Sequence, residues 1–215
     1  MSPTAPVPVT PTVKAANPGP LGLFGFGLTT LLLSSINSGL LPPEALAVVV
    51  PPAFAYGGTA QFVAGVFEFK LGNTFGGVAF CSYGAFWWWF SLLLWTLGAG
   101  WLKAPAPVGM ATALMLWGVI TFILWIVTFR LNKMLWSVFF LLFVTFFALA
   151  TKDFGFGASW GKLGGYLGLL TGIGALLLGG IELLNAVAGY PVISTGAPMV
   201  SNPSLSGRIG VGIPE

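Results

Sequence analysis

The chain has 215 residues, of which 56% are hydrophobic and only 6% are charged. Soluble domains carry roughly 25% charged residues, so this chain could not cover a water-facing surface and would expose large apolar patches. The net charge of +3 comes from eight scattered Lys and Arg, without the basic stripe of a nucleic-acid-binding protein. The composition therefore predicts a membrane protein and excludes soluble and nucleic-acid-binding classes.

The reactive side chains are few. Histidine is absent, and Cys81 is the only cysteine, so the chain can form neither an intrachain disulfide nor the usual Cys and His metal sites. The apolar runs also lack a paired acid and base for catalysis. We expect no metal, no cofactor and no catalytic residues, and an enzyme is the least favoured class.

The two ends of the chain differ from its middle. Residues 1–16 are rich in Pro, Thr and Ala, which predicts a disordered tail. They lack the basic start of a signal peptide, so we expect the first apolar run to stay attached. Residues 17–188 form the predicted transmembrane domain, and residues 189–215, rich in Pro, Ser and Gly, form a predicted irregular tail.

Six apolar runs follow one another along the middle of the chain, each near the roughly 20 residues that cross a bilayer as a helix. They cover about residues 20–41, 45–69, 74–97, 108–129, 135–150 and 163–188. Prolines, glycines and charges separate them. The runs are continuously apolar rather than alternating, which disfavours a β-barrel. The predicted fold is all-α, a polytopic membrane protein with six transmembrane helices.

The basic residues give the orientation, because cytoplasmic loops carry an excess of Lys and Arg. With both termini in the cytoplasm, five basic residues lie on that side: Lys14, Lys70, Arg130, Lys133 and Arg208. Three lie on the other side: Lys103, Lys152 and Lys162. The distribution favours cytoplasmic termini.

Polar residues inside a span face protein or a water-lined path. In the second run, Gly58, Gln61, Gly65 and Glu68 recur at steps of three and four residues and share one helical face. Such a stripe predicts either a pathway lining or close packing of helices through small residues. The carboxyl group of Glu68 favours the pathway, because a carboxylate inside a span needs a partner or a use.

Two asparagines mark predicted helix starts. Asn17 precedes Pro18, and Asn73 precedes Thr74, both arrangements that suit a helix N-terminus. The first and third spans enter the bilayer from the same side, so both positive helix ends would face one vestibule and attract a carboxylate. The alternative is that these are two ordinary helix caps.

Other features of the spans leave their role open. Phe26, Thr29, Thr30, Ser82 and Tyr83 suit a narrow, partly apolar pore for a small amphiphilic anion. Trp87 to Trp89 are expected to pack against lipid or neighbouring helices. In the last span, glycines at small-xxx-small spacing predict tight packing or oligomerisation: Gly161, Gly164, Gly165, Gly168 and Gly172. Glu182 and Asn185 are expected near the membrane interface.

Three segments resemble one known family. NPGPLGLFGFGLTT at residues 17–30 is similar to the signature of the acetate uptake transporters, the succinate-acetate permease group that includes fungal acetate permeases. EFKLGNTFGGVAFCSYGAFW at residues 68–87 is similar to the segment that joins the second and third helices of that family. YGGTAQ at residues 56–61 adds to the resemblance, which covers most of residues 17–188.

The resemblance implies uptake of acetate, and in some members succinate, by proton symport or a channel-like anion pathway. It also implies a homo-oligomer, a hexamer, in the plasma membrane. Asn17, Pro18, Leu21 and Gly22 belong to the signature, and Phe26 and Tyr83 match the aromatic constriction of the family. We place the third constriction residue at Phe143, where the family usually has Leu, so a bulkier side chain would tighten the pore.

The sequence also departs from the family pattern, since Gly19 replaces the usual Ala of the signature and NAVAGYPV closes the last span. Our hypothesis is that a carboxylate attracted near Asn17 and Asn73 passes Phe26, Tyr83 and Phe143. A further expectation places Thr30, Gln61, Glu68 and Thr74 along the pathway, with Glu68 as a candidate for proton coupling. The rival functions are ammonium or ammonia export and a non-transporting membrane sensor or scaffold.

Overall fold

The computed structural model describes residues 15–200, and this part of the chain is helical and contains no strand. Six helical stretches are long and apolar enough to cross a membrane, which confirms the predicted all-α, six-span fold. They are α1 (Gly19–Asn37), the composite second span (Pro43–Lys70), α4 (Thr74–Gly98), α5 (Pro107–Thr128), α6 with its extension (Lys133–Phe156) and α7 (Ala158–Ala188).

The second span is continuous but irregular. A short 3-10 turn (Pro43–Ala45) leads into α2 (Leu46–Pro52), then a π-helical segment (Ala53–Ala60), then α3 (Gln61–Lys70). Pro51 and Pro52 lie inside this span and lack the N–H that an α-helix would use. The wider π-helical turns follow directly, and such segments are frequent at functional sites. The regular helix resumes at Gln61.

Side-chain caps and glycine turns set several helix ends. Asn73 Oδ1 accepts a hydrogen bond from Gly76 N at the start of α4, and Asn132 Oδ1 accepts one from Leu135 N at the start of α6. Gly72 adopts a positive φ of 80° in the tight turn between α3 and α4. The polar connections that divide the sequence into apolar runs therefore also divide the structure into spans.

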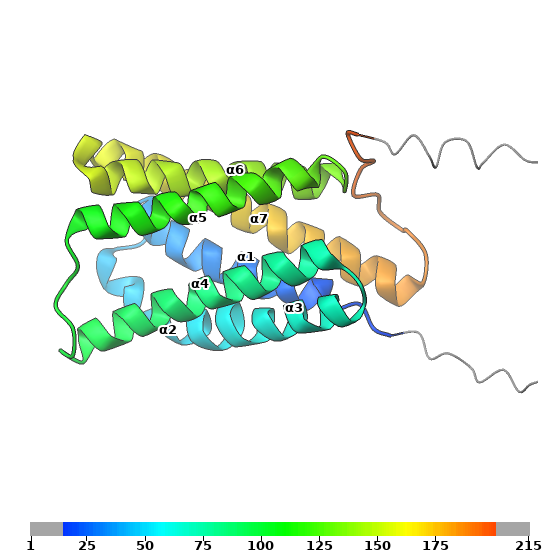
Figure 1. Cartoon of the computed structure of the whole chain (residues 1–215), viewed down its shortest axis with the longest axis horizontal. Helices are drawn as coiled ribbons and strands as arrows, with labels where there is room; N and C mark the ends of the chain where they lie inside the picture. Colours follow the sequence, from blue (N-terminus) through cyan, green and yellow to red (C-terminus); the bar gives the residue numbers. More distant parts are fainter. Residues whose placement is uncertain (1–14, 201–215) are drawn as a thin grey trace, which may run out of the picture.

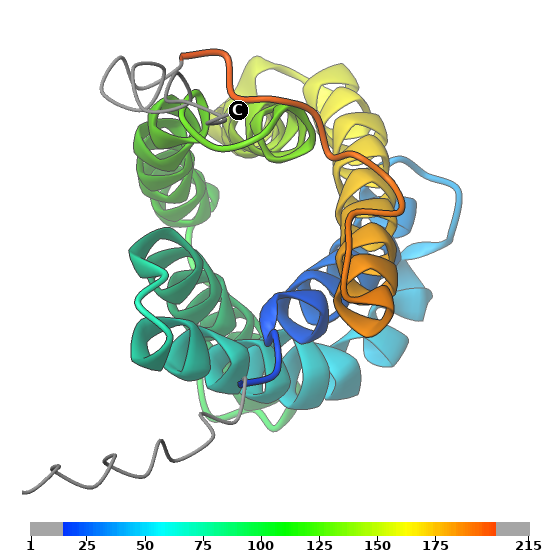
Figure 2. The same ribbon diagram turned by 90° about the vertical axis from the view of Figure 1, so that its right-hand side faces the viewer.

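The spans stand side by side around a common axis (Figure 2). The main packing pairs are α1 with α7, α7 with α6, α6 with α5, and α3 with α4 (Figure 1). Residues 15–18 and 189–200 both lie at one end of the bundle, beside the start of α4 and the end of α7 (Figure 1). In this segment, Asn185 Oδ1 accepts hydrogen bonds from Val192 N and Ile193 N.

The glycines of α7 pack within the chain. An added Cβ at Gly165 would collide with the backbone at Ser38, and one at Gly172 would lie 3.0 Å from the Gly27 carbonyl oxygen of α1. Gly168 faces Ser34 of α1 in the same way. The small-residue spacing predicted from the sequence thus brings α7 against α1, since glycine allows the two backbones to approach closely.

The stripe of the second span combines close helix packing with the lining of a cavity. Its glycines bring the second span against α4: a Cβ at Gly65 would lie 2.6 Å from the Cys81 backbone nitrogen, and Gly58 faces the Trp88 ring. Its polar members, Gln61 and Glu68, are buried and line a cavity in the bundle. Close packing and cavity lining therefore alternate along one helical face.

Candidate functional site

A cavity of about 70 Å³ lies toward the end of the bundle where residues 15–18 enter. The polar part of its lining comes from α3, from α4 with its N-cap, and from α7: Gln61, Glu68, Asn73, Tyr83 and Glu182. By the same measure one water needs about 10–15 Å³, so the cavity has room for a molecule of a few non-hydrogen atoms. We call it the first cavity.

Two carboxyl groups converge in the first cavity. An added Cβ at Gly19 would lie 2.6 Å from Glu182 Oε2 and 3.3 Å from Glu68 Oε1, so the two groups flank the same point. Asn73 Nδ2 donates a hydrogen bond of 2.7 Å to Glu68 Oε2. Gly19 leaves the space that the Glu182 carboxyl group occupies, and the Ala usual in the family signature would push that group away.

Asparagine side chains of the chain itself cap the two predicted helix starts. Asn17 Oδ1 accepts a hydrogen bond from Gly19 N, and the helix begins at Gly19 rather than at Pro18. Asn73 caps α4 as predicted, and the carboxyl group beside that helix start belongs to Glu68, whose Cδ lies 3.0 Å from an added Cβ at Gly76. The backbone N–H groups of Gly19 and Gly76 at the two helix starts therefore already have hydrogen-bond acceptors, the side chains of Asn17 and Asn73.

A second cavity, of about 270 Å³, lies toward the opposite end of the bundle. Thr30, Ser34 and Asn37 of α1 contribute its polar lining. Lys152 and Asp153 also line it, and they form an ion pair of 2.8 Å between Lys152 Nζ and Asp153 Oδ1. The two cavities therefore differ in charge, since a cation lines only the second among the residues described.

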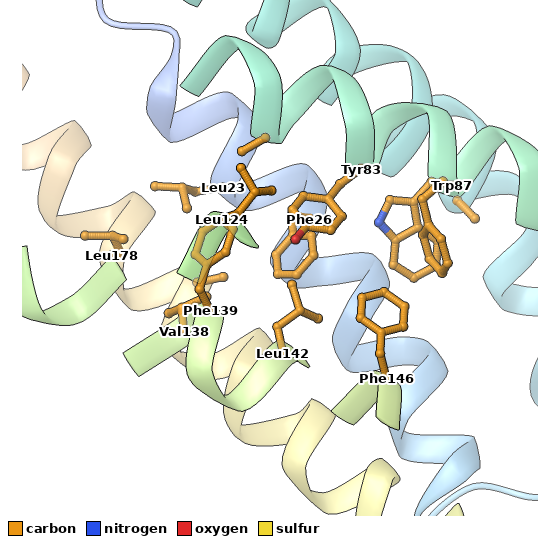
Figure 3. Close-up of a cluster of buried hydrophobic side chains, with 14 of the residues drawn as sticks. Leu23, Phe26, Tyr83, Trp87, Leu124, Val138, Phe139, Leu142, Phe146 and Leu178 are labelled. Atoms are coloured by element: carbon orange, nitrogen blue, oxygen red, sulfur yellow. The ribbon is translucent and has the colours of Figure 1, made fainter. Parts of the chain in front are cut away.

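A cluster of apolar side chains separates the two cavities. Phe26 and Leu142 line both of them, and Tyr83 lines the first. The rings of Phe26 and Tyr83 are 5.4 Å apart between centroids, and Tyr83 donates a hydrogen bond of 3.0 Å from its hydroxyl to Thr121 Oγ1. Figure 3 shows Phe26, Tyr83 and Leu142 pointing toward one another. We call these three residues the constriction.

The placement of Phe143 at the constriction is wrong. Phe143 lines neither cavity and packs between Phe122 and Trp125, with ring centroids 5.4 and 5.1 Å away. Consecutive residues of an α-helix point about 100° apart. Leu142 therefore faces the axis of the bundle, whereas Phe143 faces α5. A leucine therefore occupies the third position, and the expected narrowing by a bulkier Phe does not occur.

The structure brings together most of the other predicted pathway residues. Phe26, Gln61, Glu68, Asn73 and Tyr83 line the first cavity, and Phe26 and Thr30 line the second. Thr74 is exposed and lines neither. Asn17 lines a surface groove beside Glu182. Of the signature residues, Gly22 packs against the Phe80 ring, and Pro18 accepts hydrogen bonds from Leu21 N and Gly22 N.

Sequence reasoning missed several residues of the site. Glu182, expected near the interface, reaches the first cavity, and a carboxyl group inside a span was the available signal. Trp87 packs in the buried core, as expected, but it also lines the second cavity, and its indole N–H has no partner in the described chain. No sequence pattern distinguished Leu142 from the neighbouring apolar residues.

The fold and the site define a multi-span helical membrane protein with two cavities that meet at an apolar constriction. A family model described as the GPR1/FUN34/yaaH family matches residues 2–199. The chain belongs to this family, which confirms the resemblance found in the sequence.

Named relatives agree with this assignment. The chain is 40% identical over 189 residues to an uncharacterized protein of Methanothermobacter thermautotrophicus, covering 85% of this chain and 92% of the relative. It is 39% identical over 183 residues to the succinate-acetate/proton symporter SatP of Escherichia coli, covering 85% and 96%. The solved structure of the bacterial acetate channel SatP superposes with a TM-score of 0.81 at 39% identity, covering 85% of this chain and all of that one.

Proposed function

We propose that the chain moves small carboxylates, acetate and also succinate, across a membrane, either by proton symport or through a channel-like anion pathway. The observation that carries the proposal is the constriction of Phe26, Tyr83 and Leu142 between two mainly apolar cavities that each hold a few polar side chains. A narrow apolar passage favours a small solute with one polar end, since a second charge adds a desolvation cost. The names of relatives, a symporter and a channel, support carboxylate transport and leave its coupling to be measured.

The finer parts of the proposal concern the setting of the transporter. We place it in the plasma membrane, with both termini cytoplasmic, and expect a homo-oligomer, a hexamer, in which each subunit holds its own pathway. It is a transporter rather than an enzyme. Cross-linking in native membranes followed by mass determination tests the oligomer, because a monomeric product would contradict the hexamer.

The direct test is uptake of labelled acetate into liposomes that contain the purified protein, with and without an inward proton gradient. Protein-free liposomes report the passive leak of acetic acid. Stimulation by the gradient supports coupled transport, and gradient-independent flux above the leak supports an anion channel. No flux above the leak contradicts the proposal and favours a non-transporting sensor or scaffold.

A second candidate, ammonium or ammonia export, has an observation of its own. The carboxyl groups of Glu68 and Glu182 lie beside aromatic rings in the first cavity, an environment that also suits a cation. The chain is 39% identical over 179 residues to ammonia transport outward protein 2 of Saccharomyces cerevisiae, covering 77% of this chain and 60% of that relative. Flux of labelled methylammonium, undiminished by excess acetate, would establish this function instead.

A further inference from the structure

We propose that the first cavity binds the carboxylic acid in its neutral, protonated form, through two hydrogen bonds with the side-chain amide of Gln61. The inference rests on the proposed function and specifies which form of the substrate the site recognises. It assigns a chemical role to Gln61 and to the carboxyl groups beside it.

Gln61 is the first observation. Its side chain is 0% exposed, and neither Oε1 nor Nε2 has a hydrogen-bond partner in the described chain. Buried amide groups without partners are rare, because they lose their bonds to water without replacement. The residue lines the first cavity, at the point where α3 begins after the π-helical segment. An amide held in this way gains its partners when a ligand enters.

The amide selects between the two forms of an acid. A carboxylic acid carries an O–H donor beside a C=O acceptor, and a primary amide carries a C=O acceptor beside an N–H donor. The two groups can therefore form a pair of hydrogen bonds face to face. A carboxylate has acceptors only, so one of its oxygens would accept from Nε2 while the other faced Oε1. Gln61 thus favours the neutral acid.

The charges around Gln61 point the same way. Glu68 and Glu182 can be negative or neutral, and no Lys or Arg belongs to the described lining of the first cavity. The remaining titratable group there is Tyr83. The nearby cations face elsewhere: Lys70 Nζ lies 5.2 Å from the centroid of the Phe67 ring, and Lys133 packs against Gly196. An anion would enter without a positive partner, at a desolvation cost that a neutral molecule avoids.

Proton coupling follows without a relay of side chains. An acid that enters the first cavity with its proton carries that proton through the constriction, and no bond to a protein group has to form or break. Movement of one acid molecule then moves one proton and no net charge. The contrasting cation of the second cavity, Lys152, is paired with Asp153 at 2.8 Å.

The test compares three probes on the purified full chain in detergent: acetate, acetamide and trifluoroacetate. Acetamide is a neutral analogue of acetic acid at every pH, and trifluoroacetate is an anion throughout. We expect acetamide to bind, and the apparent Kd of acetate, relative to that of acetamide, to rise about tenfold for each pH unit above the acid's own pKa. The Gln61→Leu variant, similar in size, should weaken binding of acetamide and of acetate at low pH by about tenfold or more.

A control variant and defined contrary results complete the test. Thr112→Val removes an exposed hydroxyl that bonds only to Val108 O of its own helix, and it should bind all three probes as the unaltered chain does. Trifluoroacetate binding as tight as that of acetate, with no effect of Gln61→Leu, would overturn the inference and indicate an anion site. Ammonium binding without acetamide binding would overturn it in favour of a cation site. Because binding is measured without flux, failure of transport in liposomes would contradict the proposed function separately.

Discussion

At the scale of single residues, the constriction depends on which face of α6 reaches the axis. Leu142 is 4% exposed and lines both cavities, whereas Phe143 packs against α5. Leu142→Ala should widen the passage and raise the rate for succinate relative to acetate. Lowering the barrier for the larger acid by about 1 kcal/mol would give about a fivefold change in that ratio. Competitive uptake of the two labelled acids into liposomes measures it.

The neighbouring residue supplies the control for this comparison. Phe143→Ala removes a larger side chain from the same helix, outside both cavities. It should leave the ratio of succinate to acetate uptake unchanged, even if it lowers stability. A change of selectivity in Phe143→Ala without one in Leu142→Ala would place the constriction elsewhere.

Gln61 also has a consequence for stability. Replacing a buried amide that lacks partners with Leu of similar size removes a cost of about 1–3 kcal/mol. Gln61→Leu should therefore raise the free energy of unfolding of the ligand-free protein, while Thr112→Val should change it little. Thermal unfolding in detergent without carboxylate measures both. A marked loss of stability in Gln61→Leu would mean that the amide has partners in the folded protein.

The sequence predicted much of this site and missed parts of it for identifiable reasons. Gln61 and Glu68 stood out because polar groups in lipid-length runs are costly and hence informative. Glu182 is also a polar group in an apolar run, but its position late in a helix of 31 residues led us to expect it near the membrane interface rather than in the first cavity. Leu142 could not be distinguished from Phe143, since the phase of an entirely apolar helix leaves no amphipathic pattern to read.

At the scale of elements, α7 and α1 approach closely because glycines face the contact. An added Cβ at Gly165 would meet the backbone at Asn37 and Ser38, which cannot rotate away as a side chain can. Gly165→Ala should therefore destabilise the protein by about 1–3 kcal/mol or more, as overpacked sites do. Chemical denaturation in detergent micelles is the measurement.

The same helix provides a matched control for that substitution. A Cβ at Gly180 would meet nothing within 4 Å, so Gly180→Ala tests helix propensity alone. Ala is favoured over Gly by about 1 kcal/mol in a helix interior, and Gly180→Ala should leave stability equal or higher. Equal effects at the two positions would show that the contact between α1 and α7 is not close-packed in the membrane.

Most element boundaries were accessible from the sequence to within two residues, because charges, prolines and glycines end the apolar runs, but the fifth run was predicted to end at residue 150 instead of Phe156 and the sixth to begin at residue 163 instead of Ala158. The internal irregularity of the second span was not. Pro51 and Pro52 predict a disturbance of the helix, but they do not predict the π-helical segment that follows, which packs against α4 through Gly58 and Trp88. The small-residue spacing of the last span correctly predicted a close helix contact. It did not predict that the partner is α1, because the spacing of one helix does not identify the helix that packs against it.

At the scale of the whole molecule, the cavities occupy opposite ends of one bundle and differ in charge. The first cavity presents Glu68 and Glu182 without a cation, and the second presents the Lys152 and Asp153 pair. The cation of the second cavity is paired with Asp153 and the described lining of the first cavity holds none, so a solute that crosses as a neutral acid avoids the cost of an unpaired negative charge at both ends. This asymmetry gives the orientation of the protein a functional meaning, since it decides which side of the membrane meets the acidic end.

With six spans, both chain ends lie on the same side of the membrane, and only the identity of that side has to be determined. The turn around Arg130 and the described chain ends lie at the end of the bundle near the first cavity, and the loop around Lys103 lies at the other end (Figure 1). The excess of basic residues predicts that the Arg130 end is cytoplasmic. In a Cys81→Ser background, Lys103→Cys should react with an impermeant maleimide on intact cells, and Arg130→Cys should react only after permeabilisation. The reverse pattern would turn the acidic cavity outward, where it would meet the incoming acid first.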